Sequence, residues 1–117
     1  MRFVALVAIV PDSKEEEAVD IAKKSGAGGV TIFNGKTIGL EEKKVFFGLT
    51  LEENVSALLF ILPEKLSMKV FKAFRKELGL HNDENANGMV FTFPLSHLSG
   101  MESKEVDLFE KEILEEL

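Results

Sequence analysis

Two long apolar runs, each ending in a proline, dominate the pattern of hydrophobic and polar positions. The first spans residues 3–11 and the second spans residues 55–63. A charged stretch follows each run, and a shorter segment that opens with glycine follows each charged stretch, at 28–33 and 88–93. Short apolar runs bounded by turn residues favour strands, and charged stretches with a 3.6-residue apolar period favour helices. Each half of the chain therefore predicts a strand, a helix and a second strand.

The repetition of this unit predicts the architecture. Two βαβ units in one chain form the doubled arrangement of ferredoxin-like domains, an α+β fold with an antiparallel sheet and two helices on one face. The length of 117 residues corresponds to about one domain. We assign residues 1–100 to this domain and residues 101–117 to an acidic, amphipathic C-terminal helix.

Both charged stretches carry helical signals. Ser13 and Glu16 have the spacing of a capping box, which predicts a helix from about residue 13 to 25, ended by Gly26. The second helix is predicted over about residues 64–78. The positions expected to face the core are Ala18, Val19, Ile21 and Ala22 in the first helix and Leu66, Val70, Phe71, Phe74 and Leu78 in the second.

The segments outside these units are polar or charged. Turn residues at 34–39, charges at 40–44 and a strand-like return at 45–51 predict a projecting hairpin loop. The asparagine-rich segment 81–87 predicts a loop that leads into the last strand. Apolar residues recur at helical spacing beyond position 101, so we expect the C-terminal helix to dock weakly or to exchange onto a neighbouring subunit.

The apolar runs are hydrophobic at odd and even positions alike, which indicates a sheet that is buried on both faces. Two helices on one face leave the other face uncovered. Leaving a large apolar side chain in water costs about 1.5–3 kcal/mol. Self-association is therefore expected to cover the second face, with the C-terminal helix as a competing cover. The side chains expected there are Val4, Leu6, Val10, Leu58 and Phe60.

Composition narrows the class of protein. The formal net charge is −6, and residues 102–117 hold seven acids against two lysines, so the rest of the chain is close to neutral. We therefore expect no nucleic-acid partner, because such binding uses a basic field. The chain contains no cysteine, which excludes a disulfide frame and thiolate metal ligands. The N-terminal apolar run is too short to insert in a membrane and lacks signal-peptide features, so we expect a cytoplasmic protein.

No catalytic motif is recognisable, so we expect no enzymatic activity. The sequence contains no nucleophile elbow, no phosphate-binding P-loop and no cysteine–histidine pair. His81 and His97 stand alone in loop-like sequence, and adjacent carboxylates such as Glu41 and Glu42 indicate solvated surfaces. We assign no metal site.

Two glycine-containing segments each allow two interpretations. The segment 35–39 combines two glycines with Lys36, and Asn87 precedes Gly88 at the start of the last predicted strand. Glycine lets backbone amides approach an anion, so either segment could cradle a phosphate. The alternative is a tight turn or strand entry, which composition alone favours.

The order of these parts resembles the PII signalling family. The resemblance covers about residues 1–100 and implies homotrimers of ferredoxin-like subunits. Their sheets line the centre, clefts between subunits bind ATP, ADP or AMP, and an exposed loop engages a regulated protein or a membrane transporter. The residues that carry the resemblance are the strand ends at Pro11 and Pro63, Gly29-Val-Thr31, Lys36-Thr-Ile-Gly39 and the run from Asn87 to Pro94.

Carried over by position, the resemblance implies a nucleotide site and a partner-binding loop. Thr31 matches a threonine that contacts adenine, Gly39 matches a glycine at the loop opening, and Asn87 with Gly88 matches an Asp-Gly pair that cradles phosphates. Lys36 adds a positive charge to this site. The loop residues implied in partner binding are Lys36, Glu41, Glu42, Lys43 and Lys44.

The sequence also departs from the PII pattern. Val55 and Met89 stand where phosphate-binding lysines are expected, and residues 94–100 lack two arginines of the family. These losses favour a nucleotide with fewer phosphates, another small anion or no ligand. The chain contains no tyrosine, which excludes uridylylation of the loop.

Two further classes remain as alternatives. A trimer that binds metal ions, similar to the CutA-type proteins, would need His81, His97 and carboxylates to converge. An enzyme on a ferredoxin-like scaffold would need a nucleophile or a poised base, which the sequence does not supply.

Overall fold

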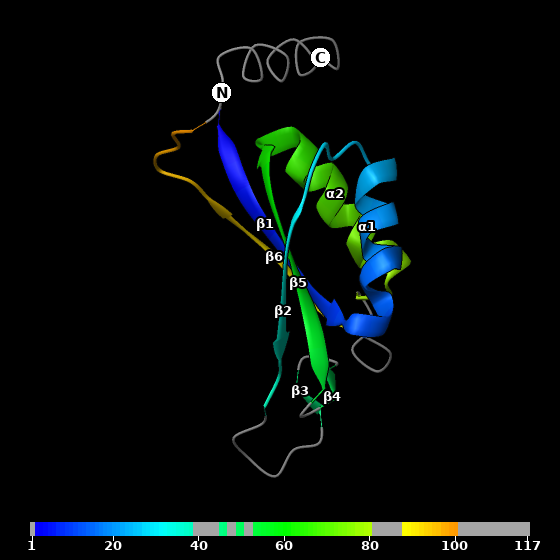
Figure 1. The fold of residues 1–117 in the computed structure, drawn as a ribbon. Helices are drawn as coiled ribbons and strands as arrows, with labels where there is room; N and C mark the ends of the chain where they lie inside the picture. Colours follow the sequence, from blue (N-terminus) through cyan, green and yellow to red (C-terminus); the bar gives the residue numbers. More distant parts are fainter. Residues whose placement is uncertain (1, 39–44, 47–48, 51–52, 81–87, 101–117) are drawn as a thin grey trace.

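A computed structural model describes residues 2–38, 45–46, 49–50, 53–80 and 88–100. Its main feature is a four-stranded antiparallel sheet with the strand order β2-β5-β1-β6 (Figure 1). The strands are β1 (Phe3–Pro11), β2 (Thr31–Lys36), β5 (Asn54–Pro63) and β6 (Met89–Pro94). A separate pair joins β3 (Val45–Phe46) and β4 (Leu49–Thr50) within the predicted hairpin loop. The sheet order confirms the predicted ferredoxin-like arrangement.

Two helices cover one face of this sheet. They are α1 (Glu15–Lys24) and α2 (Glu64–Glu77), which lie side by side on the same side of the strands (Figure 1). The predicted apolar stripes face the sheet, and the rings of Phe60 and Phe74 meet at a centroid distance of 5.9 Å. The core thus lies between the helices and one sheet face, as in a two-layer α+β domain.

The start of α1 differs from the prediction. A short 3₁₀ turn, η1 (Asp12–Lys14), precedes α1, and no side chain caps either element. The predicted capping box of Ser13 and Glu16 is therefore wrong, because Ser13 lies inside the tight turn that follows Pro11 instead of at the helix start. The predicted end is confirmed, since Gly26 has a φ of 107° directly after the helix.

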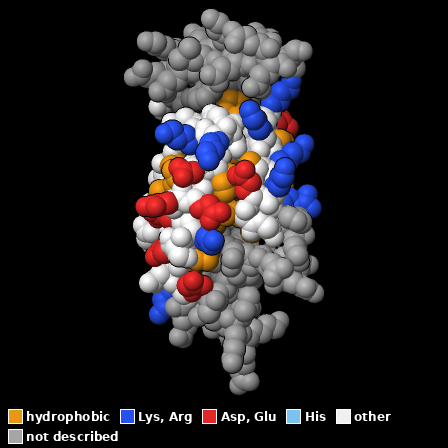
Figure 2. Space-filling model, turned by 90° about the vertical axis from the view of Figure 1, so that its right-hand side faces the viewer, with side chains coloured by type: hydrophobic (Ala, Val, Ile, Leu, Met, Phe, Trp, Pro, Cys, Tyr) orange, Lys and Arg blue, Asp and Glu red, His pale blue; other side chains and the backbone are white. Residues whose placement is uncertain are grey.

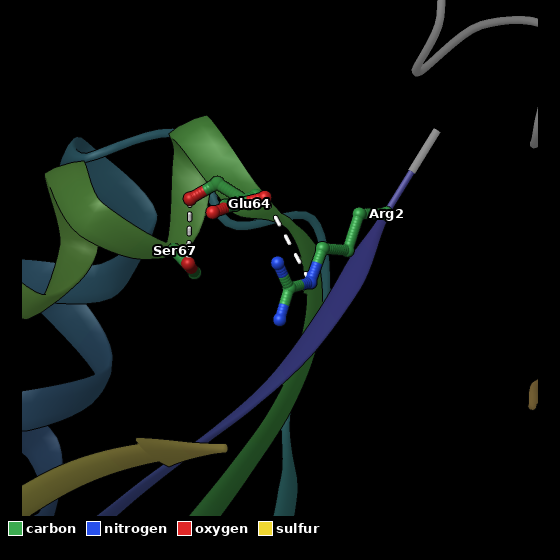
Figure 3. A network of polar contacts seen from close by, with 3 residues as sticks. All are labelled: Arg2, Glu64 and Ser67. Carbon is green, nitrogen blue, oxygen red and sulfur yellow. Dashed lines mark hydrogen bonds and ion pairs between the residues drawn. The ribbon is translucent and has the colours of Figure 1, made fainter. Parts of the chain in front are cut away.

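The start of α2 is joined to the first strand by polar contacts. The Glu64 backbone N–H donates to the carbonyl of Arg2 at 3.0 Å, and the Arg2 guanidinium lies 3.9 Å from the Glu64 carboxylate (Figure 3). The Ser67 hydroxyl donates to the Glu64 carbonyl at 2.6 Å. These contacts place the first turn of α2 beside the first residues of β1.

The side chains expected on the uncovered face lie on the other face. Val4, Leu6, Val10, Leu58 and Phe60 are all buried, and the last four belong to the core under the helices, so the prediction for these five residues is wrong. Because successive strand residues point to opposite faces, the neighbouring positions line the uncovered side. In an uninterrupted apolar run, odd and even positions are equally hydrophobic. The sequence therefore does not show which of these two sets of side chains faces the helices.

The uncovered side, which we call the open face, is nevertheless apolar as predicted. Val7 of β1 lies opposite Leu59 of β5 and opposite Phe91 of β6, so these side chains form one row. Ile61, Phe91 and Phe93 are 37%, 38% and 45% exposed, and no described element packs on them. On the strands β1, β5 and β6 the large apolar side chains of the open face are Val7, Ile9, Leu59, Ile61, Phe91 and Phe93.

Several predictions concern residues outside the described part of the chain. They are the charged loop segment 40–44, the loop 81–87 and the C-terminal helix within 101–117. Among the described residues, no helix is long and apolar enough to cross a membrane.

Candidate functional site

The projecting loop begins where β2 and β5 run side by side. Lys36, the last residue of β2, lies opposite Asn54, the first residue of β5. One further backbone hydrogen bond extends this strand pairing into the loop: the Thr37 N–H donates to the Glu53 carbonyl at 3.0 Å. The base of the loop is therefore an extension of the main sheet, and Lys36 is exposed at its root.

A polar cluster around one buried hydroxyl lies next to this base, with Asp12 and Asn34 exposed and Glu15 half-buried. Ser56 of β5 is fully buried, and its hydroxyl is 2.7 Å from Glu15 Oε1 and 2.8 Å from Asp12 Oδ1. The amide nitrogen of Asn34, directly opposite Ser56 on β2, donates to the Ser56 hydroxyl at 3.2 Å. The same amide lies 3.3 Å from the Glu15 carboxylate and 3.5 Å from the Asp12 carboxylate.

This cluster joins three parts of the molecule. Asn34 belongs to β2, Ser56 to β5, and the two carboxylates to the turn and helix that follow β1. Hydrogen bonds to charged groups in a partly dry site are stronger than neutral ones. The cluster therefore fixes the two strands of the loop base against the start of α1.

The cluster is not apparent from the sequence alone. Its one visible signal was Ser56, a polar residue inside the otherwise apolar run 55–63. A polar side chain in a buried strand requires a partner, but the partners became known only with the strand register.

The predicted nucleotide-site residues lie on opposite edges of the sheet. Thr31 and Lys36 are exposed on β2, whereas Gly88 precedes β6. Two strands separate these edges, which corresponds to about 14 Å across the sheet. One subunit alone therefore does not bring these residues together. Thr31 and Lys36 also point to opposite faces, because they are five positions apart along the strand, an odd number.

Gly88 is required by the packing of the backbone. It has a φ of 139°, and a Cβ atom at this position would collide with the carbonyl oxygen of Ile9. The strand-entry interpretation thus has a geometric basis. Gly39, Asn87 and loop residues Glu41, Glu42, Lys43 and Lys44 lie outside the described residues.

Comparison with known proteins identifies the fold. No protein-family model matches the sequence, and no curated protein matches it significantly. Solved structures do match. CPII from Thiomonas intermedia K12, a nitrogen regulatory PII-like protein bound to ADP, AMP and bicarbonate, superposes with a TM-score of 0.62 at 17% identity, over 86% of this chain and 98% of that chain.

A second CPII structure, bound to ADP, AMP and acetate, has a TM-score of 0.60 at 19% identity and covers 82% of this chain and 90% of its own. The GlnK–ATP complex of B. subtilis has a TM-score of 0.60 at 15% identity, over 81% and 83% of the two chains. The fold is that of the PII-like proteins. The predicted resemblance is therefore confirmed for the architecture.

Two departures from the PII pattern can now be placed in this fold. Val55 is buried opposite Pro11 and Gly35, and Met89 lies half-buried opposite Ile9. Both side chains thus take part in packing at the two positions where the resemblance expects phosphate-binding lysines.

The metal-site alternative gains no support from the described residues. His97 is exposed, and no three side chains of His, Asp or Glu converge in the described ranges. His81, the other histidine, lies outside these ranges.

Proposed function

We propose that this protein is a non-enzymatic regulator of the PII type, which forms a homotrimer in the cytoplasm. In this proposal each cleft between subunits binds a small ligand, and the loop that begins at Lys36 contacts a regulated protein or a membrane transporter. The observation that carries the proposal is the open face, an apolar sheet surface that the helices of the subunit leave uncovered.

The composition of the open face supports association through the sheet. Six large apolar side chains from three strands form one continuous surface, and several of them are more than one-third exposed in the subunit. Burying such a side chain stabilises an assembly by about 1.5–3 kcal/mol. Large contiguous apolar surfaces on a subunit are typical of permanent interfaces.

The placement of the site residues supports a ligand cleft between subunits. Thr31 and Lys36 lie on the β2 edge and Gly88 lies at the β6 edge, so a single subunit offers two partial sites. In a cyclic trimer the β2 edge of one subunit can approach the β6 edge of the next. Each cleft would then combine the two partial sites.

The loss of phosphate-binding lysines, compared with the PII pattern, indicates which class of ligand the cleft binds. CPII binds ADP and AMP, and GlnK binds ATP, according to the structures described above. In this chain valine and methionine replace two cationic phosphate contacts, and each such contact contributes about 1.5–3 kcal/mol. We therefore propose an adenine nucleotide with one or two phosphates, in preference to ATP.

Two measurements test the proposal. Sedimentation equilibrium at micromolar concentration is expected to give three times the subunit mass, and a stable monomer would contradict the assembly. Isothermal titration with ATP, ADP and AMP is expected to show tighter binding of ADP or AMP than of ATP. If none of the three produces heat, the nucleotide is wrong even if the trimer is confirmed.

A further inference from the structure

Helix α2 carries a row of lysines on the side that faces away from the core. Lys65, Lys69, Lys72 and Lys76 are spaced four, three and four residues apart, which places them on one side of a helix. All four are exposed, and the buried residues of the helix lie on its opposite side. We call these four residues the lysine row.

The lysine row lacks acidic partners within the described part of the chain. In that part of the chain Arg2 pairs with Glu64 and Lys14 pairs with Glu17, and neither ion pair includes a residue of the row. Figure 2 shows one side of the molecule, where Lys and Arg side chains lie along the right edge and across the upper part and most Asp and Glu side chains lie toward the left and centre. Four like charges over about 16 Å of helix repel one another and favour an anionic occupant.

An apolar contact point lies beside the row. Met68 is 44% exposed and lies on α2 between Lys65 and Lys69 in sequence. Methionine adapts its shape to apolar partners. The surface therefore suits an occupant that is acidic and also carries some apolar side chains.

The C-terminal segment of this chain has this composition. Residues 102–117 contain seven acids and two lysines, which gives a net charge of −5. The apolar residues of this segment are Val106, Leu108, Phe109, Ile113, Leu114 and Leu117.

The segment also follows a part of the chain that lies near the start of α2. The Leu95 N–H, just after β6, donates to the Phe3 carbonyl at 3.1 Å, and the Glu64 N–H at the start of α2 donates to the neighbouring Arg2 carbonyl. The chain therefore leaves the sheet beside the first turn of α2. The 17 residues after Gly100 span up to about 56 Å when extended, which exceeds the roughly 21 Å length of α2.

We propose that the acidic C-terminal segment docks on the lysine row of α2. The contact is electrostatic along the four lysines and apolar at Met68. It covers the outer face of the helix and leaves the open face of the sheet free for other subunits. This proposal is independent of any ligand in the clefts.

Paramagnetic NMR tests this placement in the full-length protein. The chain has no cysteine, so Leu117→Cys creates a single site for a nitroxide spin label. The label is expected to broaden the amide signals of α2, with recovery when the nitroxide is reduced. Amides of the open-face residues are expected to keep their intensity.

Charge reversal supplies the decisive variants. The labelled K65E/K69E/K72E/K76E variant is expected to lose the broadening of α2, and converting Glu105, Glu112 and Glu116 to lysine in that background is expected to restore it. The matched control is K23E/K24E, which reverses two exposed lysines at the end of α1 and should leave the broadening unchanged. Restoration by the second set of reversals shows that loss in the first variant is not caused by misfolding.

Three results would overturn the proposal. Broadening of the open-face amides would place the segment over the sheet, and broadening that survives all four reversals would exclude an electrostatic contact. If no amide of α2 is broadened, the C-terminal segment does not dock on the lysine row. An external acidic protein or an anionic membrane surface would then be the expected partner of the row.

Discussion

The hydroxyl of Ser56 lies 2.7 Å from the Glu15 carboxylate, although 41 residues separate the two in sequence. Through this contact the strand that leaves the loop is fixed to the first turn of α1. Asn34 joins the strand that enters the loop to the same group. A displacement of the loop base in either strand would therefore have to break hydrogen bonds to a buried hydroxyl.

We expect Ser56→Ala to destabilise the fold by about 1.5–3 kcal/mol, the usual range for hydrogen bonds to charged groups. The measurement is the free energy of unfolding from urea denaturation. Ser96→Ala, at an exposed position after β6, is the control and should change stability by less than about 0.5 kcal/mol. A double-mutant cycle with Glu15→Gln should show a coupling energy well above zero, and additivity would contradict a direct contact.

Gly88→Ala is expected to destabilise the protein by at least about 3 kcal/mol. The substitution adds a Cβ that collides with the Ile9 carbonyl, at a φ of 139° that other residues rarely adopt. The matched control is Gly29→Ala, where a Cβ meets no atom within 4 Å and φ is not positive. Thermal unfolding of both variants checks the prediction, and equal melting temperatures would show that the backbone contact at Gly88 is not tight.

Phe91→Glu is expected to convert the proposed trimer into folded monomers. Phe91 is on the open face, and a carboxylate there would be buried without a partner in the assembly but solvated in the free subunit. Thr92→Glu changes the next residue of the same strand, which is exposed and points to the other face. Sedimentation should give a monomer for the first variant and a trimer for the second, while circular dichroism stays native for both.

Lys36→Gln is expected to weaken binding of ADP or AMP about tenfold or more, because it removes one charge-assisted contact at the loop root. Lys24→Gln removes an exposed charge at the end of α1 and serves as the control. Isothermal titration measures both affinities. Unchanged affinity in Lys36→Gln would exclude this lysine from the site.

Much of the fold could be predicted because the chain repeats one pattern. The runs that end in Pro11 and Pro63 became the two central strands, and both glycine-ended charged stretches became helices. The sequence does not predict which side chains of β1 face the helices, because Val4 and Val7 are equally apolar. Only the strand register shows that the two lie on opposite faces of the sheet. The capping box at Ser13 failed because the geometry after Pro11 begins with a 3₁₀ turn.

The site was less predictable than the fold. Asp12, Glu15, Asn34 and Ser56 belong to segments far apart in sequence, and only strand pairing and the η1 turn bring them into contact. Gly88 allowed two interpretations in the sequence, and the nearby Ile9 backbone now explains the need for glycine. Its role toward a ligand stays a prediction.

The separation of Thr31 and Gly88 on the two outer strands has a genetic consequence. In the proposed ring, a subunit defective on the β2 side can still serve the cleft that uses its β6 side. Two different inactive alleles, one for each side, should therefore complement each other when expressed together. If the two kinds of subunit mix at random in equal amounts, about a quarter of the clefts would combine an intact β2 side with an intact β6 side.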